Sequence, residues 1–542
     1  MKKNKKPENA KEKIIATYLK IVTKTKRYPT VSEMLNVAGI TNHMIKHHFG
    51  NITKLHSIMR DTHRDVIDKH IITSEILFTR KRLDNMKSIV KKGDMFFVTT
   101  AVSGVSVDKA ALESVRNFCK RKNAELLVFP VQDVASRSAK SSVYFIPPEL
   151  QDDHFIYDDI SVNSNLFLSS IKLSAKHINP LTGLSRIGQR NGSFIYGSPK
   201  QFLEYVATTA SKSRSPHALM TTGAITAPNY NSHDRYMSER TSYLAENDHV
   251  VGGIIVEVVD DKTFHFRQVQ CAPDGSFVDL GNRYHSDGKT SKENVRLVMG
   301  DWHSGATDEK VRKGISNLCK KLDVIDIIAH DFHDGYCINH HDFDIPGKMA
   351  MKAMNDKRSL QEEIENGAAD IDWLHSLIPG NIIMVKSNHD EVLDRYLMSA
   401  RYVHDSENHY MSLDLAKKLL EGHDPLKYAY EEWGGVKQPK RIVWLQRDEE
   451  YRIGGVECGQ HGDLGANGAR GSMLSIEKAY GNCVVGHTHS AAILRGVFRV
   501  GTSSRLSLDY NKGPSSWTHT CCLVYEDGSR QLINFMGSEW HK

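Results

Sequence analysis

The segment Cys483-Val484-Val485-Gly486-His487-Thr488-His489 joins an apolar stretch, a glycine and two histidines that are two positions apart. In extended backbone, side chains at positions i and i+2 lie on the same face, so both imidazoles can point into one pocket. A His-x-His pair alone is a weak indication of metal binding, because the chain contains 28 histidines. Its interpretation depends on polar residues upstream.

Three apolar stretches upstream are predicted to be β-strands, and polar residues that can bind metals follow each of them. In chain order these residues are Asp301 and His303 after residues 296–299, Asp331 after residues 324–329, Asn388 and His389 after residues 382–385, and then His461. Carboxylate, amide and imidazole groups without thiolates suit manganese, and iron, zinc or nickel would also fit. The series therefore predicts a site for divalent cations.

In order and residue type, this series resembles the D-x-H, GD, GNH, H and GHxH motifs of the calcineurin-like metallophosphoesterases, over about residues 295–510. The resemblance implies a C-terminal four-layer αββα sandwich that binds two divalent metal ions, with Mn²⁺ expected. It assigns one ion to Asp301, His303, Asp331 and His489, and the other to Asp331, Asn388, His461 and His487. Asp331 would bridge the two ions, and His389 would be the catalytic residue.

The chain departs from the family pattern at two positions. His330 and Ser387 replace glycines that usually precede the bridging Asp and the Asn, so the loop geometry is expected to differ while the ligands remain. The continuation at residues 333–344 is rich in His and Asp. It would supply extra ligands or substrate contacts, or form a solvated loop beside the cations.

The ligand set predicts the type of reaction. Two cations about 3.5–4 Å apart bind a phosphate oxygen and activate a water for in-line attack at phosphorus. His389 would protonate the leaving oxygen or bind a phosphate oxygen. The family alone leaves protein phosphatase, nucleotidase, cyclic-nucleotide phosphodiesterase and nuclease open.

The amino-terminal segment is basic and has helical periodicity. Residues 1–60 contain thirteen Lys and Arg and three acidic residues, a net charge of +10, whereas the whole chain carries +6. Apolar spacing predicts helices at 11–25, 31–38 and 41–50, and this pattern resembles the helix-turn-helix of TetR-type repressors. Under that resemblance, the residues facing a major groove or phosphates would be Thr41, Asn42, His43 and Lys46. The alternative is a helical packing or oligomerisation module.

Length and pattern predict a multidomain α/β protein, because 542 residues exceed one core. Residues 95–100, 107–122 and 125–131 are predicted to form a βαβ unit. The predicted domains are a helix-turn-helix domain at 1–60, a helical connector at 61–93, an α/β domain of unknown role at 94–294 and a metallophosphoesterase domain at 295–542. No apolar run approaches the ~20 residues of a membrane span. Eight cysteines without CxxC spacing suit a reducing cytoplasm.

The basic segment favours DNA among the possible phosphoester substrates. The combination of both ends resembles the nucleases with which T-five-type bacteriophages degrade host DNA, which implies Mn²⁺ dependence, the host cytoplasm and a homo-oligomer. We therefore expect a metal-dependent DNase that contacts DNA with little or no sequence specificity. The alternatives are a small-substrate phosphodiesterase or phosphatase whose amino-terminal domain only oligomerises, and a DNA-binding regulator with a vestigial phosphoesterase domain.

Overall fold

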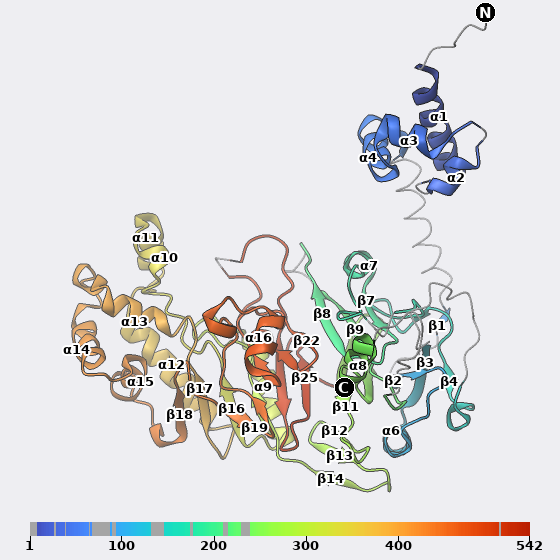
Figure 1. The fold of residues 1–542 in the computed structure, drawn as a ribbon. Helices are drawn as coiled ribbons and strands as arrows, with labels where there is room; N and C mark the ends of the chain where they lie inside the picture. Colours follow the sequence, from blue (N-terminus) through green and yellow to red (C-terminus); the bar gives the residue numbers. More distant parts are fainter. Residues whose placement is uncertain are drawn as a thin grey trace, which may run out of the picture. The chain divides into compact units, whose positions relative to one another are not determined.

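The chain divides into two units, residues 1–87 and 88–542, in the computed structural model (Figure 1). The described residues are 8–25, 29–37, 39–63, 65–67, 87–88, 94–131, 146–173, 177–209, 215–228, 239–508 and 511–542. Most of the predicted connector, residues 61–93, lies outside them. Its described part holds the end of one helix, the helical residues 65–67 and a short strand, β1 (Lys87–Ser88).

The amino-terminal unit is entirely helical among its described residues before β1. Its helices are α1 (Glu8–Thr25), α2 (Val31–Leu35), α3 (Asn42–Phe49) and α4 (Ile52–Thr62). Tyr18, Met34 and Leu55, which come from three different helices, are fully buried in one small apolar core. The helices predicted at 11–25, 31–38 and 41–50 therefore form, and α2 ends three residues earlier than predicted.

A six-stranded sheet dominates the carboxyl-terminal half of the second unit. Its order is β18 (Ile442–Leu445), β17 (Ile382–Val385), β16 (Asp326–Ala329), β15 (Arg296–Val298), β24 (Thr520–Val524) and β25 (Arg530–Asn534). The first four strands are parallel, and β24 runs antiparallel to β15. The carboxyl ends of the parallel strands consequently meet at one edge of the sheet.

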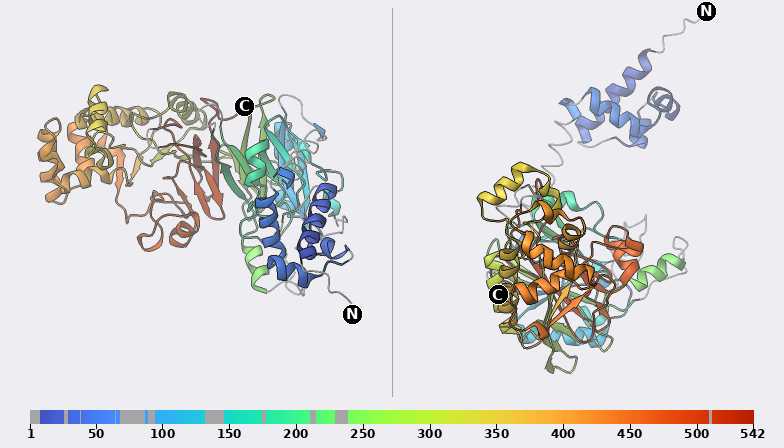
Figure 2. Two further views of the ribbon diagram at one scale, coloured as in Figure 1. Left: turned by 90° about the horizontal axis from the view of Figure 1, so that it is seen from above. Right: turned by 90° about the vertical axis from the view of Figure 1, so that its left-hand side faces the viewer.

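The two faces of this sheet pack against different partners because the side chains alternate. Leu297, Ile327 and Ile382 face a core shared with helices. These helices are α9 (Glu309–Leu322), α12 (Leu360–His375), α13 (Glu391–Met398), α14 (His409–Leu420) and α15 (Pro425–Tyr428). The helices between residues 340 and 430, yellow to orange, gather at one end of the unit, away from the blue strands of the middle region (Figures 1 and 2).

An eleven-stranded sheet packs on the other face, where Val298, Ile328 and Ile383 share a core with Val484 and Phe498. Its order is β1, β5 (Ile160–Ser161), β6 (Leu166–Ser169), β7 (Ser193–Tyr196), β9 (His217–Thr221), β8 (Phe202–Val206), β22 (Ala492–Leu494), β23 (Val497–Arg499), β21 (Cys483–Val485), β20 (Val456–Glu457) and β19 (Arg452–Ile453). β8 precedes residue 294 and pairs with β22, which follows it. The predicted domain boundary at residue 294 therefore separates two neighbouring strands of one sheet.

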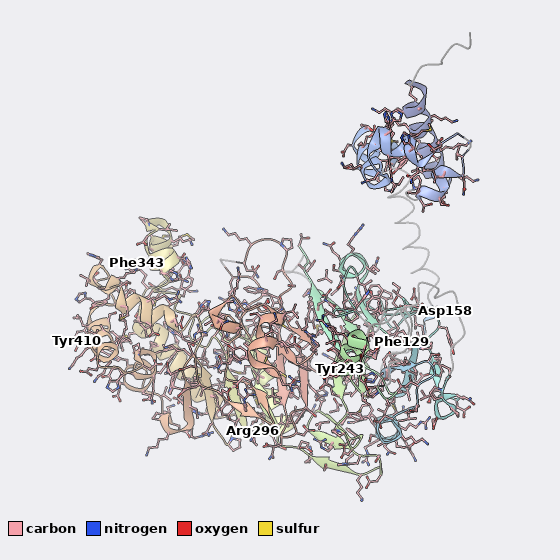
Figure 3. The ribbon with its side chains drawn as sticks, in the orientation of Figure 1. Phe129, Asp158, Tyr243, Arg296, Phe343 and Tyr410 are labelled. Atoms are coloured by element: carbon pink, nitrogen blue, oxygen red, sulfur yellow. The ribbon has the colours of Figure 1, made fainter. Side chains whose placement is uncertain are left out.

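A five-stranded sheet packs on the eleven-stranded sheet and shares a core with it. Phe129 belongs to this five-stranded sheet and is labelled in Figure 3. Its order is β11 (Phe264–Gln270), β10 (Gly252–Val258), β2 (Met95–Val102), β3 (Glu125–Val131) and β4 (His154–Phe155). β2 and β3 are parallel and are connected by α6 (Lys109–Lys122), which confirms the predicted βαβ unit.

The remaining elements connect or border these layers. They are α7 (Ser185–Asn191), α8 (Glu239–Asn247), α10 (His340–Phe343), α11 (Pro346–Met354), α16 (Met473–Tyr480), the sheet of β12 (Phe277–Asp279), β13 (Asn282–Tyr284) and β14 (Thr290–Lys292), and the short turns η1 (Pro148–Leu150), η2 (Arg401–His404), η3 (Ala429–Trp433), η4 (Pro439–Arg441) and η5 (Ala466–Gly468). The chain is thus a mixed α/β protein. No helix in its described part is both long and apolar enough to cross a membrane.

Candidate metal centre

The predicted metal ligands meet where the two large sheets face each other. Four of them follow the carboxyl ends of β15, β16 and β17, namely Asp301, His303, Asp331 and Asn388, and the predicted catalytic residue His389 follows β17 as well. The others follow β20 and β21 of the eleven-stranded sheet: His461, His487 and His489. Residues that are almost 200 positions apart in the chain therefore surround one point.

The first group contains Asp301, His303, Asp331 and His489, whose side chains are all buried and offer ligand atoms within 4.8 Å of one another. The Nε2 atoms of His303 and His489 lie 3.0 Å apart, and His489 Nε2 is 3.2 Å from Asp301 Oδ2. His303 Nε2 is also 3.8 Å from Asp331 Oδ2, so two imidazole nitrogens and two carboxylates converge in an arrangement that a shared cation would stabilise. These are the four residues predicted for the first ion.

The second group contains Asp331, His461 and His487. His461 Nε2 lies 3.2 Å from Asp331 Oδ2, and His487 Nδ1 lies 3.1 Å from Asn388 Oδ1. The four residues predicted for the second ion are therefore also neighbours. Asp331 belongs to both groups, as a bridging carboxylate must.

Asp334 is a residue of the site whose role the sequence left open. Its Oδ1 lies 2.9 Å from His303 Nδ1, and its backbone carbonyl lies 2.9 Å from His389 Nδ1. Asp334 thus orients a predicted ligand and the predicted catalytic histidine together. In the same His-rich stretch, His333 instead packs on Tyr430, and Asp342 pairs with Lys352.

Asp370 supports the loop that carries Asp301 and His303, and no sequence signal pointed to it. It accepts hydrogen bonds from Trp302 Nε1 at 3.0 Å and from Ser304 Oγ at 2.8 Å, and it pairs with Arg312. Trp302 is fully buried. The Asp370 carboxylate of α12 therefore fixes the position of this loop.

His330 and Ser387, which stand where the family usually has glycine, both have ordinary backbone. Neither His330 nor Ser387 has a positive φ, so neither position requires glycine. Ser387 Oγ accepts a hydrogen bond from the backbone N–H of Asp390, and the Ser387 N–H donates to the Asp390 carboxylate. The buried His330 ring lies 5.8 Å from the ring of His461. Both side chains therefore fit these positions with ordinary backbone.

Buried charge at this point fits a divalent cation. Asp301 Oδ1 and Asp331 Oδ1 are buried and have no hydrogen-bond partner among the described residues. Unpaired buried carboxylate oxygens are costly unless a cation compensates them. The donor set, of oxygen and imidazole nitrogen without thiolate, is the one that manganese, iron or zinc accepts.

The pKa shifts at the site follow from the same charges. Burial acts to lower the pKa of His303 and His461, but nearby carboxylates outweigh it and raise both to about 9. Burial lowers the pKa of His487 and His489, which favours the neutral imidazole that binds a metal. A bound cation would displace the proton from His303 and His461. Asp331 has a pKa well below its ordinary value, because the surrounding histidines outweigh its burial.

The four predicted DNA contacts lie on the surface of the amino-terminal unit. Asn42, His43 and Lys46 are exposed side chains of α3. Thr41 precedes α3, and its hydroxyl accepts a hydrogen bond from the Met44 N–H at 3.2 Å. Thr41 therefore caps the helix that carries the other three.

Comparison with known proteins gives one informative relative. No family model matches the chain. The chain is 27% identical over 478 residues to Protein A1 of Escherichia phage T5, which covers 83% of each protein. The match supports a bacteriophage origin.

Proposed function

We propose that the protein is a metal-dependent nuclease that hydrolyses phosphodiester bonds of DNA. The observation that carries this proposal is the pair of buried ligand groups that share Asp331 at one edge of the six-stranded sheet. Such a pair suits displacement at phosphorus. The similarity to a phage T5 protein supports a role in phage infection, for which we propose degradation of host DNA in the host cytoplasm.

The metal ions and the chain's own side chains would have separate roles in phosphodiester hydrolysis. Two divalent cations, with Mn²⁺ proposed, would supply electrophilic stabilisation of the phosphoryl group when bound. His389 Nδ1 lies 2.9 Å from the carbonyl oxygen of Asp334 and donates its proton there. When the ring is also protonated at Nε2, that proton would pass to the leaving oxygen and leave a neutral His389. Asp334 holds the imidazole in this orientation.

The amino-terminal unit would bring DNA to the enzyme. Asn42, His43 and Lys46 form an exposed polar face on α3, in a segment with a net charge of +10. Contacts to phosphates attract DNA over a long range and weaken as salt increases. The affinity for DNA is therefore expected to fall with ionic strength.

The central test is incubation of the purified protein with circular and linear DNA in Mn²⁺, Mg²⁺ or Zn²⁺. We expect metal-dependent cutting, and a His389→Ala variant that cuts ~10²–10⁴-fold more slowly while retaining its metal. His423→Ala is the matched control, because His423 is an exposed histidine outside the metal centre. Equal cutting by the His389→Ala variant would remove His389 from the mechanism.

Removal of residues 1–87 separates the nuclease from a small-substrate phosphodiesterase. The boundary follows the division of the chain into two units. We expect the shortened protein to lose cutting of plasmid DNA at physiological salt and to keep its turnover of a chromogenic phosphodiester. Unchanged rates on both substrates would favour the small-substrate enzyme, and metal-stimulated hydrolysis of either would exclude a vestigial site.

A further inference from the structure

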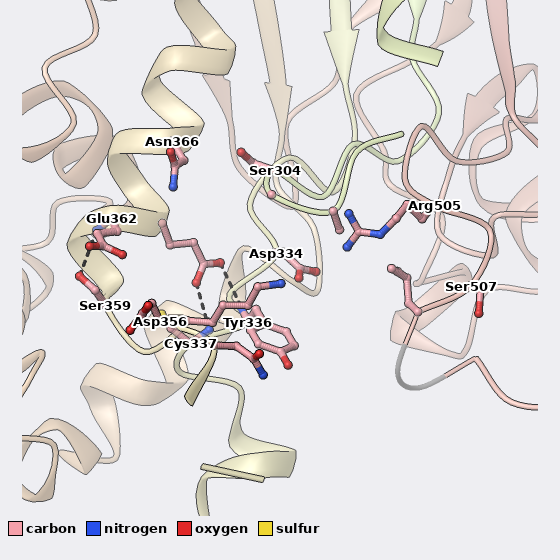
Figure 4. A pocket seen from close by; sticks show the side chains of 16 residues that line it. Ser304, Asp334, Tyr336, Cys337, Asp356, Ser359, Glu362, Asn366, Arg505 and Ser507 are labelled. Atoms are coloured by element: carbon pink, nitrogen blue, oxygen red, sulfur yellow. Dashed lines mark hydrogen bonds between the residues drawn. The ribbon is translucent and has the colours of Figure 1, made fainter. Parts of the chain in front are cut away.

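A cavity of about 460 Å³ opens beside the metal centre (Figure 4). Its walls come from the loop after β15, the loop after β16, the start of α12 and residues 505–508. Asp334 lines this cavity and also contacts His303 and His389. A molecule in the cavity would therefore lie next to the reacting groups.

One side of the cavity is cationic. The guanidinium of Arg505 points into the cavity toward Asp334 (Figure 4). Its side chain has no ion pair or hydrogen bond among the residues that the structure describes. Lys357 also lines the cavity, and its ammonium lies 5.5 Å from the centre of the Tyr336 ring without a described carboxylate partner. Both cations are thus available to an anionic group.

The opposite side offers hydrogen-bonding groups on α12. Glu362 and Asn366 lie across the cavity from Arg505 (Figure 4). The neighbouring Glu363 is already used, because it accepts hydrogen bonds from the backbone N–H groups of Tyr336 and Cys337, both at 3.0 Å. The Glu362 carboxylate and the Asn366 amide have no hydrogen-bond partner in the part of the chain that the structure describes, so both can pair with a nucleobase.

We propose that this cavity binds the nucleotide that adjoins the scissile phosphate. Arg505 and Lys357 bind the next phosphate of the strand, while Glu362 and Asn366 contact the base. The inference rests on the proposed nuclease function and specifies its substrate. A nucleotide carries an anionic phosphate at one end and hydrogen-bond donors on its base at the other. A simple phosphate ester would leave Glu362 and Asn366 of α12 without a partner. A cavity of this size accommodates one small polar ligand.

The first experiment uses a chromogenic phosphodiester as substrate of the full chain. Its hydrolysis is inhibited by a deoxynucleoside 3′,5′-bisphosphate, which carries both of the phosphates that the proposal requires, or, for comparison, by inorganic phosphate. We expect the nucleotide to inhibit at a concentration at least about tenfold lower than that of inorganic phosphate, because it gains charge-assisted hydrogen bonds in the cavity. Equal inhibition by both anions would overturn the inference, although the enzyme would still be a phosphodiesterase.

The second experiment compares variants of the cavity. Arg505→Ala and Asn366→Ala should each reduce the advantage of the nucleotide, and each should raise the KM for an oligonucleotide more than the KM for the chromogenic ester. Lys440→Ala is the matched control, because Lys440 is an exposed cation just before β18, at the end of the sheet away from the metal centre.

The outcomes separate this inference from the proposed function. Oligonucleotide cleavage with an unchanged KM in both variants would overturn the nucleotide site and leave the nuclease intact. Failure of the unmodified protein to cut DNA under any metal would overturn the nuclease itself. A rise in KM in the Lys440→Ala variant as large as that in the Arg505→Ala variant would show only a general effect of charge, and would also overturn the inference.

Discussion

At the scale of single residues, four predicted ligands have left-handed backbone. The φ angles are 48° at His303, 42° at Asp331, 78° at His487 and 59° at His489. Each such residue costs of order 1–3 kcal/mol and persists only where the surroundings hold it. Here the His303 N–H donates to the Asp331 carbonyl at 2.8 Å, and the His487 N–H donates to Asp301 Oδ2 at 2.8 Å. The ligand positions thus depend on contacts between distant segments.

Gly486 provides a direct test of this dependence. A Cβ at this position would lie 2.1 Å from Asp301 Oδ1, a distance that the buried carboxylate cannot accept without moving. We therefore expect Gly486→Ala to lose at least one equivalent of bound metal and most of its hydrolytic activity. Elemental analysis of the purified protein measures the metal content.

The control for this substitution is Gly347→Ala, because a Cβ at Gly347 meets no atom within 4 Å and its φ is not positive. This variant should keep its metal and its activity. Full metal occupancy in the Gly486→Ala variant would show that the Asp301 carboxylate has another position available to it.

At the scale of elements, the start of α2 depends on a capping box. Thr30 Oγ1 accepts from the Glu33 N–H at 3.2 Å, and the Glu33 carboxylate accepts from the Thr30 N–H at 2.9 Å. These bonds satisfy two groups that a helix start otherwise leaves unpaired. A helix of five residues has little other local support.

We predict that Thr30→Ala destabilises the amino-terminal unit by about 1 kcal/mol, because the first turn of α2 loses its cap. Chemical denaturation of residues 1–87, followed by circular dichroism, measures the change. Ser32→Ala, in the same helix, is the control, since Ser32 is exposed and its side chain does not cap the helix. A loss of the same size in both variants would contradict the role of the cap.

At the scale of the whole molecule, the unit of residues 88–542 contains a half-buried histidine away from the metal centre, His249. Burial lowers the pKa of His249 to about 4, against an ordinary value of 6.5. Below pH 6.5 the unfolded chain takes up a proton at this residue and the folded chain does not. Stability therefore falls as the pH decreases from 6.5 toward 4.

This pH dependence can be measured through the melting temperature between pH 7.5 and pH 4.5. A single histidine contributes at most about 1.4 kcal/mol per pH unit in this range. His249 lies 2.8 Å from the carbonyl of Thr226, and a Gln side chain would still donate there. We expect His249→Gln to flatten the pH dependence, and an identical slope would exclude His249 as a contributor.

Local patterns predicted many of the elements and the composition of the site. The three amino-terminal helices and the βαβ unit follow from apolar spacing and turn residues, which act over a few positions. The pairing of β8 with β22 was not predictable in this way, because each strand has fewer than six residues and its partner is almost 300 positions away. Short strands carry no signal of which distant strand they join.

The candidate site also has features that the sequence predicted and features that only the fold showed. The chain's local chemistry was sufficient to identify the histidine, aspartate and asparagine side chains that follow strands, since strand and turn preferences are short-range. The family resemblance already predicted Asp331 as the bridge, and the fold places it in both ligand groups. Only the fold showed that Asp334 and Asp370 hold the loops and that a cavity with Arg505 lies beside them. Those relations depend on side chains brought together by the packing of two sheets, and packing is a property of the assembled core rather than of any one segment.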